Sequence, residues 1–241
     1  MTDIALVTGA NKGIGLETAR QLGQRGIQLL VAARDQAKSE AAAAQLLSEG
    51  LDAQGLVLDV GSDASIEHAA AEVAARHAKL DILVNNAGVL FDDPDLTPSQ
   101  QDLDVWRRTY AINLFGVVAV TRAFLPLLRK ASAARIVNLS SILGSLTLHA
   151  DPGSPIYDST MPAYNSSKSA VNAWTLSLAH ELRDTPIKVN SVHPGHVKTD
   201  MGGQRAPMAI VEGARSSVAM ATLAADGPSG SFTHLGKTLP W

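Results

Sequence analysis

The 241-residue sequence contains no cysteine. This absence excludes disulfide bonds, a thiolate nucleophile and any metal site that requires a cysteine ligand. The seven histidines are scattered along the chain and form no His-x-x-x-His pair, and no acidic cluster typical of a metal site is present. We therefore expect chemistry that uses no bound metal.

The sequence also lacks an excess of charge of one sign. Its 20 basic and 23 acidic residues give a net charge of −3, and no run of Lys or Arg occurs. Such a chain offers no basic surface to nucleic acid or to an anionic membrane. No apolar run reaches membrane-spanning length, and the first residues do not resemble a signal peptide. We expect a cytoplasmic protein without a nucleic-acid or membrane partner.

Short apolar segments recur along the chain and alternate with helix-length amphipathic segments. The expected strands are 4–8, 27–33, 53–59, 80–85, 134–140 and 187–193, and the first three expected helices are 15–26, 37–50 and 62–79. No repeat or linker divides the sequence, so residues 1–241 are expected to form a single domain. Because parallel strands need crossover connections, the alternation predicts a doubly wound, Rossmann-like α/β sheet of about seven parallel strands with helices on both faces.

A glycine-rich motif follows the first expected strand. Gly9, Gly13 and Gly15 have the spacing G-x-x-x-G-x-G and precede a helical pattern that starts at Leu16. Glycines at such a junction let the backbone approach a pyrophosphate, and the N-terminus of the following helix offers free N–H groups. The motif predicts a dinucleotide site, and the alternative is a tight connection without a ligand.

A tyrosine and a lysine are four positions apart in the segment MPAYNSSKSAVNAW, which we expect to be helical. Positions four apart differ by about 40° in azimuth and about 6 Å in rise, so Tyr164 and Lys168 share one helix face. A nearby ammonium favours the phenolate and should lower the pKa of Tyr164, which would make it a general acid. The alternative is a pair that decorates an exposed helix. Tyr157 has Met161 four positions later and lacks such a cation.

Six motifs occur together in the order found in one enzyme family. They are TGxxxGxG at 8–15, NNAG at 85–88, Asn113 within INLFG, IVNLSS ending at Ser141, the Tyr164–Lys168 pair, and Pro194 with Gly195. On these motifs the sequence resembles the short-chain dehydrogenase/reductase family, along essentially the whole chain. VTGANKGIG together with AARD is most similar to the carbonyl reductases.

The resemblance implies roles for particular residues. Tyr164 would exchange the proton, Lys168 would hold the nicotinamide ribose, Ser141 would bind the substrate oxygen, and Asn113 would anchor a water beside the lysine. A structural hydrogen bond is the alternative role for Asn113, and a cap is the alternative for Ser140. The implied cofactor contacts are Gly9, Asn11, Lys12, Gly13, Ile14, Gly15, Arg34, Asp59, Val60, Asn86, Ala87, Gly88, Tyr164, Lys168, Pro194, Gly195, Val197 and Thr199.

The end of the second expected strand bears on the choice of cofactor. An acidic residue there binds the ribose hydroxyls of NAD, whereas a basic residue accommodates the 2′-phosphate of NADP. By resemblance the acidic position is occupied by Ala33, and Arg34 follows it. Lys12 adds a second positive charge, so NADPH/NADP is expected. In the alternative, Asp35 serves as the acid of an NAD site.

The resemblance implies NADPH-dependent reduction of an aldehyde or ketone. The alternatives are a 3-oxoacyl reductase, an NAD(P)-dependent alcohol dehydrogenase, and a catalytically silent NADP(H)-binding sensor. Two irregular segments, 146–162 and 194–207, are candidate substrate loops. Relatives pair through the helices that would start near Ser99 and Tyr164, so a homodimer or homotetramer is expected, with a monomer as the alternative if the segment before Tyr164 covers that face.

Overall fold

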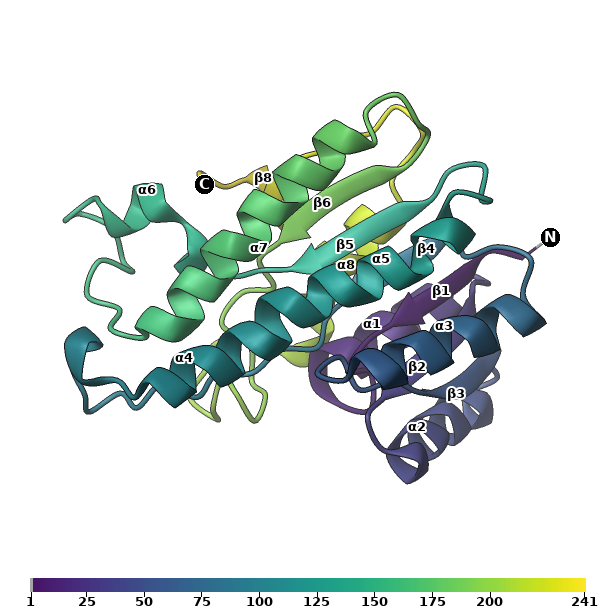
Figure 1. The fold of residues 1–241 in the computed structure, drawn as a ribbon, viewed down its shortest axis with the longest axis horizontal. Helices are drawn as coiled ribbons and strands as arrows, with labels where there is room; N and C mark the ends of the chain where they lie inside the picture. The colour runs from purple at the N-terminus through teal and green to yellow at the C-terminus, as the bar shows by residue number, and fades with distance from the viewer. Residues whose placement is uncertain (1) are drawn as a thin grey trace.

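The computed structural model describes residues 2–241 and contains an eight-stranded sheet with helices on both faces (Figure 1). Seven strands are mutually parallel, and only the last pairs antiparallel with its neighbour. The predicted α/β sheet is thus confirmed, with one antiparallel strand added at its edge. The strands are β1 Ile4–Val7, β2 Gln28–Ala33, β3 Ala53–Val57, β4 Ile82–Asn85, β5 Arg135–Leu139, β6 Lys188–Val192, β7 Phe232–His234 and β8 Lys237–Thr238, in the spatial order β3-β2-β1-β4-β5-β6-β7-β8.

Eight α-helices and three further segments of 3₁₀- or π-helix connect these strands within residues 2–241. The three helices expected early in the chain are all present, with ends shifted by one to three residues. The helices are α1 Gly13–Gly23, α2 Gln36–Ser48, α3 Asp63–Arg76, α4 Leu103–Tyr110, α5 Val117–Leu128, α6 Leu146–His149, α7 Pro162–Glu181 and α8 Ile210–Ala221. The 3₁₀-helices are η1 Pro98–Gln100 and η3 Ile142–Gly144, and the π-helix is η2 Ala111–Gly116.

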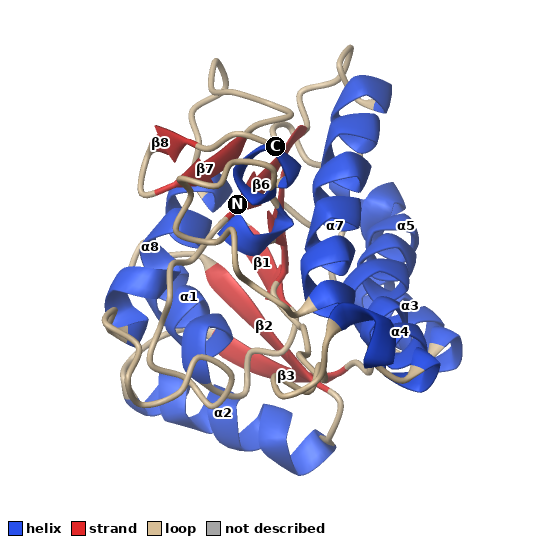
Figure 2. Cartoon of the chain, turned by 90° about the vertical axis from the view of Figure 1, so that its left-hand side faces the viewer, coloured by secondary structure: helices blue, strands red, loops and turns tan. Residues whose placement is uncertain are grey.

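Two apolar layers hold the helices against the sheet, because successive side chains of a strand point to opposite faces. Within β1, Leu6 packs in the layer that includes Phe124 of α5, whereas Val7 packs in the layer that includes Leu22 of α1. Figure 2 shows the result, with α1, α2 and α8 on one face and α3, α4, α5 and α7 on the other. Burial on both faces explains the largely apolar sequences of β1, β2 and β4, whereas β5 and β6 also bury the polar residues Asn138, Asn190 and Ser191.

The carboxyl ends of the parallel strands define the edge at which the site lies. β1 has β2 on one side and β4 on the other, so the strand order reverses next to it. In open α/β sheets, ligands bind in the crevice outside the strand ends at this reversal. The segments that follow β1, β4, β5 and β6 all begin at this edge, and they contain the motifs of the sequence.

One continuous helical stretch, Leu103–Leu128, is long enough and, over an 18-residue window with a mean hydropathy of 1.8, apolar enough to span a membrane by length and composition. It comprises α4, η2 and α5, and its inner face packs on the sheet through residues such as Val120 and Phe124. This packing is that of a core helix. The helix expected near Ser99 begins instead at Leu103, after the η1 turn, where the side chain of Asp102 caps it.

Candidate active site

Tyr164 and Lys168 lie in the first turns of α7 and are both buried, with exposed fractions of 8% and 4%. The lysine Nζ lies 5.6 Å from the centroid of the tyrosine ring, so both side chains are on one side of the helix. Lys168 Nζ also donates a 2.8 Å hydrogen bond to the carbonyl oxygen of Leu139 at the end of β5. The burial of both groups is inconsistent with the alternative of an exposed decorative pair.

Burial determines the pKa of both groups. It raises the pKa of Tyr164 to about 12, and a hydrogen bond with Ser141 opposes this effect. Burial lowers the pKa of Lys168 to about 8. The spacing predicted a lowered pKa for the tyrosine, and that prediction was wrong in direction, because removal of the phenol from water outweighs the other contributions. At neutral pH the phenol therefore carries its proton.

Ser141 follows β5 and is itself the N-cap of η3. Its Oγ accepts a 3.2 Å hydrogen bond from the backbone N–H of Leu143. The capping role considered for Ser140 thus belongs to Ser141, while the Ser140 hydroxyl donates to the carbonyl oxygen of Lys168. A hydroxyl can donate one bond and accept two, so Ser141 keeps its proton for another partner while it caps the turn.

Asn113 lies in η2, a single turn of π-helix inside the long helical stretch. Such π-bulges are frequent at functional sites. Its fully buried side chain accepts from the backbone N–H of Val89 at 2.8 Å and donates to the carbonyl oxygen of Val89 and to Ser167 Oγ at 2.9 and 3.0 Å. The side chain thus joins the segment after β4 to α7, which favours the structural alternative. The water-anchoring role stays a prediction.

The glycine turn after β1 has backbone angles that require glycine at two of its three glycine positions. Gly9 and Gly13 have φ values of 62° and 58°, which residues with a side chain rarely adopt. A Cβ at Gly15 would clash with Asn86 Nδ2 and lie 2.6 Å from the Gly9 carbonyl oxygen. The N-cap of α1, Lys12, makes no side-chain capping bond to any described residue. The turn and the start of α1 therefore fit an anionic group such as a pyrophosphate.

A family model described as short chain dehydrogenase matches residues 3–209. The chain belongs to the short-chain dehydrogenase family. A short-chain dehydrogenase of Penicillium roqueforti is 40% identical over 228 residues, which cover 91% of this chain and 88% of the relative. Carbonyl reductase [NADPH] 1 of Mus musculus is 32% identical over 281 aligned positions that cover 99% and 98% of the two chains. The NADPH-bound carbonyl reductase from chicken fatty liver has a TM-score of 0.87 at 30% identity, covering 100% and 99%.

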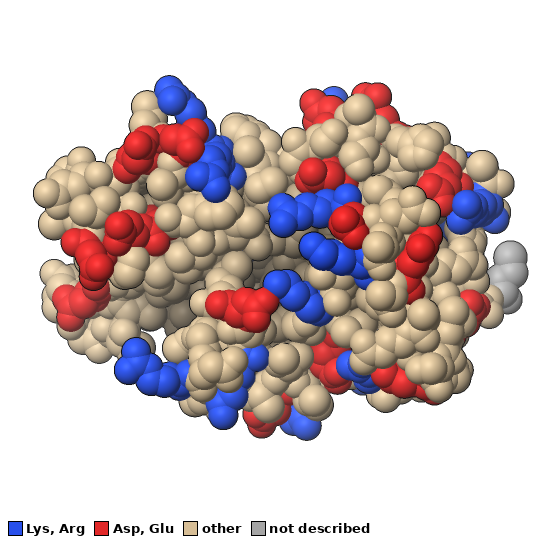
Figure 3. Space-filling view, turned by 90° about the horizontal axis from the view of Figure 1, so that it is seen from below, with Lys and Arg blue, Asp and Glu red and all other residues tan. Residues whose placement is uncertain are grey.

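In this short-chain dehydrogenase, Arg34 directly follows the carboxyl end of β2 and is exposed. The neighbouring Asp35 is the N-cap of α2, and its Oδ1 accepts a 3.0 Å bond from the backbone N–H of Lys38. Its carboxylate is already used in capping, which disfavours the alternative in which Asp35 binds a ribose. Figure 3 shows Lys and Arg side chains gathered around a hollow on one face of the molecule.

The segment after β4 supports the glycine turn. Asn86 Nδ2 donates to the carbonyl oxygens of Thr8 and Gly9 at 2.8 and 3.2 Å. Thr8 Oγ1 in turn accepts from the backbone N–H groups of Asn86 and Ala87, both at 3.0 Å. The predicted contact residue Asn86 therefore uses its amide to hold the turn. Thr8 was not among the predicted site residues, although it is the threonine of the TGxxxGxG motif.

Three further predicted residues lie in the segments that follow β3 and β4. A Cβ at Gly88 would lie 3.4 Å from Asn113 Oδ1 and 3.5 Å from Lys168 Nζ, so Gly88 lies beside both groups. Asp59, which follows β3, accepts from the backbone N–H of Gly61 at 2.9 Å. Val60 packs against Gly116 of η2. The predicted residues after β3 and β4 are thus brought to the same edge.

The loop after β6 meets the glycine turn from the other side. Gly195 has a φ of 95°, and Val197 forms a backbone bridge with Met208. Thr199 Cγ2 would lie 3.6 Å from a Cβ at Gly13. Lys12 and Asp200 form an ion pair of 2.5 Å between their exposed side chains. The loop that contains Pro194 therefore covers the turn that contains Gly13.

Among residues 2–241, no group of three or more His, Asp or Glu side chains is arranged to hold a metal ion.

One contact at the tyrosine was not predicted from the sequence. Asp92, buried in the loop after β4, accepts hydrogen bonds from the backbone N–H groups of Ala163 and Tyr164. Its place in the polar run FDDPD gave no signal that separates it from the exposed Asp93 beside it.

Proposed function

We propose that this short-chain dehydrogenase is an NADPH-dependent carbonyl reductase that acts on an aldehyde or ketone. The observation that carries the proposal is a buried phenol, Tyr164, that lies beside Lys168 and Ser141 at the sheet edge from which the glycine turn also begins. NADPH, when bound, supplies the hydride that adds to the carbonyl carbon. Relatives described as carbonyl reductases with NADPH support both the cofactor and the reaction direction.

The side chains of the site divide the work at the carbonyl oxygen. Tyr164 donates the proton, because it is protonated at neutral pH and, even with a pKa of about 12, is a stronger acid than the alcohol that forms. The Ser141 hydroxyl orients the oxygen and stabilises its developing charge. Lys168, held by its bond to Leu139, keeps a positive charge beside the tyrosine ring below pH 8.

The proposal is tested by following cofactor oxidation by the purified protein with a panel of carbonyl compounds. We expect turnover of 4-nitrobenzaldehyde or a simple diketone, with NADPH preferred over NADH because Arg34 has a phosphate to bind. Turnover with NADH alone would overturn the cofactor assignment. Faster turnover of acetoacetyl-CoA would favour the 3-oxoacyl reductase. Binding of NADPH without turnover of any compound would favour the silent sensor.

The pH dependence of the reduction follows from the two shifted pKa values. As the pH rises through about 8, Lys168 loses its proton, while Tyr164 keeps its own until about 12. The turnover number for reduction should therefore be level at neutral pH and fall above about pH 8. Lys168→Arg, whose guanidinium stays charged, should shift the fall to higher pH. Steady-state assays in buffers of constant ionic strength measure this profile, and a rate that rises above pH 8 would contradict it.

The ion pair between Lys12 and Asp200 competes with the proposed phosphate contact. While that pair is formed, the Asp200 carboxylate partly neutralises the Lys12 ammonium and weakens its attraction for a phosphate. Asp200→Asn should therefore lower the KM for NADPH, by less than about five-fold because exposed ion pairs contribute little. The KM for NADH, which lacks the 2′-phosphate, serves as the internal control and should not change. Equal shifts for the two cofactors would argue against a phosphate contact by Lys12.

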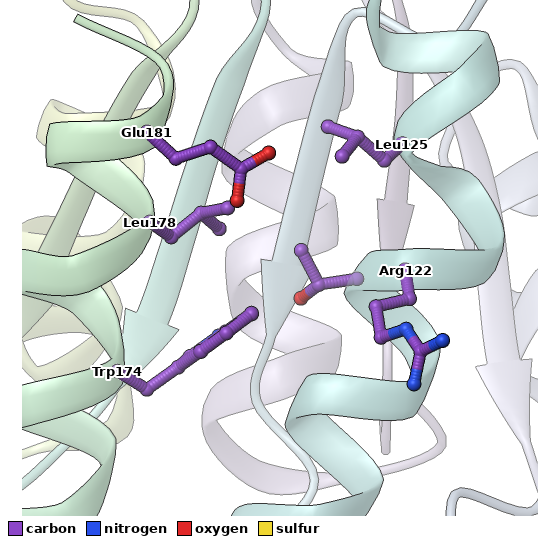
Figure 4. Close-up of a pocket in the computed structure, with 6 residues that line it drawn as sticks. Arg122, Leu125, Trp174, Leu178 and Glu181 are labelled. Atoms are coloured by element: carbon purple, nitrogen blue, oxygen red, sulfur yellow. The ribbon is translucent and has the colours of Figure 1, made fainter.

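We also propose that the chain forms a homodimer through the face made by α4, α5 and α7. Segment 146–162 lies beyond the N-terminal end of α7 and leaves this face uncovered (Figure 1). Phe115 of η2, between α4 and α5, is 63% exposed. A groove of about 320 Å³ runs between α5 and α7, with Arg122 on one wall and Trp174 and Glu181 on the other (Figure 4).

The oligomeric state is measured by light scattering after size-exclusion chromatography. We expect the mass of a dimer or a larger even assembly, and we expect Phe115→Asp to shift it toward the monomer, since it places a charge in an apolar interface. Leu235→Asp, at an apolar site outside this face that is 44% exposed, is the control and should keep the wild-type mass. A monomeric wild-type protein would contradict the proposal.

A further inference from the structure

The start of α7 lacks a local cap. Its N-cap residue, Met161, makes no side-chain capping bond within the described part of the chain, and Pro162 occupies the first helical position. The backbone N–H groups of the next two residues are bonded instead by Asp92. Its Oδ1 accepts from Ala163 N at 2.8 Å, and its Oδ2 accepts from Tyr164 N at 3.0 Å. A carboxylate at this place is further stabilised by the helix dipole.

The position of Asp92 in the sequence makes this cap unusual. Capping side chains normally belong to the N-cap residue itself. Asp92 lies 71 positions before Ala163, in the irregular segment that follows β4, and it is only 5% exposed. Two carboxylate oxygens that hold two successive N–H groups fix both the position and the orientation of the helix start. One of those groups is the backbone nitrogen of Tyr164 itself.

The same segment is also bound to the cofactor side of the site. Six residues before Asp92, the amide of Asn86 holds the carbonyl oxygens of Thr8 and Gly9 in the glycine turn. Between them, both backbone groups of Val89 are bonded to Asn113. A short series of hydrogen bonds therefore connects the turn proposed to hold the pyrophosphate with the residue proposed to donate the proton.

We propose that Asp92 is a positioning residue that sets the location of Tyr164 relative to the glycine turn. This inference rests on the proposed role of Tyr164 as proton donor. Proton transfer requires heavy-atom distances of about 2.6–3.2 Å. A misplacement of about 1 Å can reduce a rate about 100-fold. A support that ties the tyrosine to the cofactor turn therefore affects turnover more than cofactor binding.

The first test is Asp92→Asn, which keeps the shape of the side chain. Its amide NH₂ group must face one of the two backbone N–H groups, so one of these bonds is lost. We expect the turnover number for the fastest compound of the panel to fall about ten-fold or more. The KM for NADPH should stay within about two-fold, because the glycine turn is untouched. Asp93→Asn is the matched control, since it removes the same charge from the exposed neighbour, and it should leave both constants unchanged.

A second variant separates positioning from simple stabilisation of the helix. Met161→Asp gives α7 a cap of its own, and in the Asp92→Asn background it should restore the thermal unfolding temperature. It cannot restore the connection between the segment after β4 and α7, so the turnover number should stay low. Recovery of turnover together with stability would show that Asp92 only caps the helix, and would overturn the proposal. The Met161→Asp single variant measures any effect of its own on both constants.

Tyr164→Phe, assayed in parallel, distinguishes the two proposals. If this variant keeps its turnover, the proposed role of Tyr164 fails, and the positioning role fails with it. If it is inactive while Asp92→Asn turns over normally, only the inference about Asp92 is overturned. Low turnover in both, with unchanged NADPH affinity measured by cofactor fluorescence, is the result that we expect.

Discussion

Tyr164→Phe should reduce the turnover number for carbonyl reduction by about 100- to 10,000-fold, the usual contribution of a general acid. The change removes one hydroxyl from a buried ring and leaves the packing of that ring intact. Affinity for NADPH should change little, because the glycine turn and Lys168 are unaltered. The measurement is steady-state turnover at saturating cofactor, together with a fluorescence titration of NADPH.

The matched control for this variant is Tyr157→Phe. Tyr157 is 46% exposed and has Met161, not a lysine, four positions later. Loss of its hydroxyl should leave turnover within about two-fold of the wild type. Equal losses in the two variants would mean that the effect is not specific to the buried phenol, and Tyr164 would then have no special role in proton transfer.

Gly15→Ala should weaken cofactor binding, with a KM for NADPH raised at least about ten-fold. The new methyl group would overlap Asn86 Nδ2 and lie 2.6 Å from the carbonyl oxygen of Gly9. Because Asn86 Nδ2 holds the carbonyl oxygens of Thr8 and Gly9, its displacement releases the whole turn. Overpacking of this kind typically costs about 1–3 kcal/mol of stability.

A comparison with Gly50→Ala isolates the effect on the cofactor. Gly50 has a φ of 81°, and a Cβ at this position would have nothing within 4 Å, so its replacement strains the backbone without a clash. It should cost about 1–2 kcal/mol of stability and leave the KM for NADPH unchanged. If Gly15→Ala bound NADPH as well as Gly50→Ala does, the glycine turn would not be the cofactor site.

The sheet could be predicted from the sequence because its strands are buried on both faces. β1, β2 and β4 are largely apolar runs, and the alternation of strands with helix-length segments indicates parallel pairing through crossover connections. The strands at one edge of the sheet, β7 and β8, were harder to predict, since both are short and Lys237 and Thr238 of β8 are exposed. The helix predicted to start near Ser99 starts at Leu103, four residues later, because the capping residue is Asp102.

The site was predictable where one residue type is required by local geometry. Gly9 and Gly13 need a left-handed φ, and Tyr164 and Lys168 need only helical spacing to share a face. The pKa of Tyr164 could not be predicted, because it depends on how completely the rest of the chain buries the ring. The contact of Asp92 with α7 joins residues 71 and 72 positions apart, and no local pattern records it.

The proposed reaction is the reduction of a carbonyl group in this site by hydride from NADPH and a proton from Tyr164. Its most direct test is a reaction with NADPH that carries deuterium at C4, run with each of the two labelled faces, followed by mass spectrometry of the alcohol. We predict one deuterium on the carbinol carbon from one labelled face only, in equal amount to the NADPH oxidised. An alcohol without deuterium from both labelled forms of NADPH, or oxidation of NADPH without formation of an alcohol, would contradict the account.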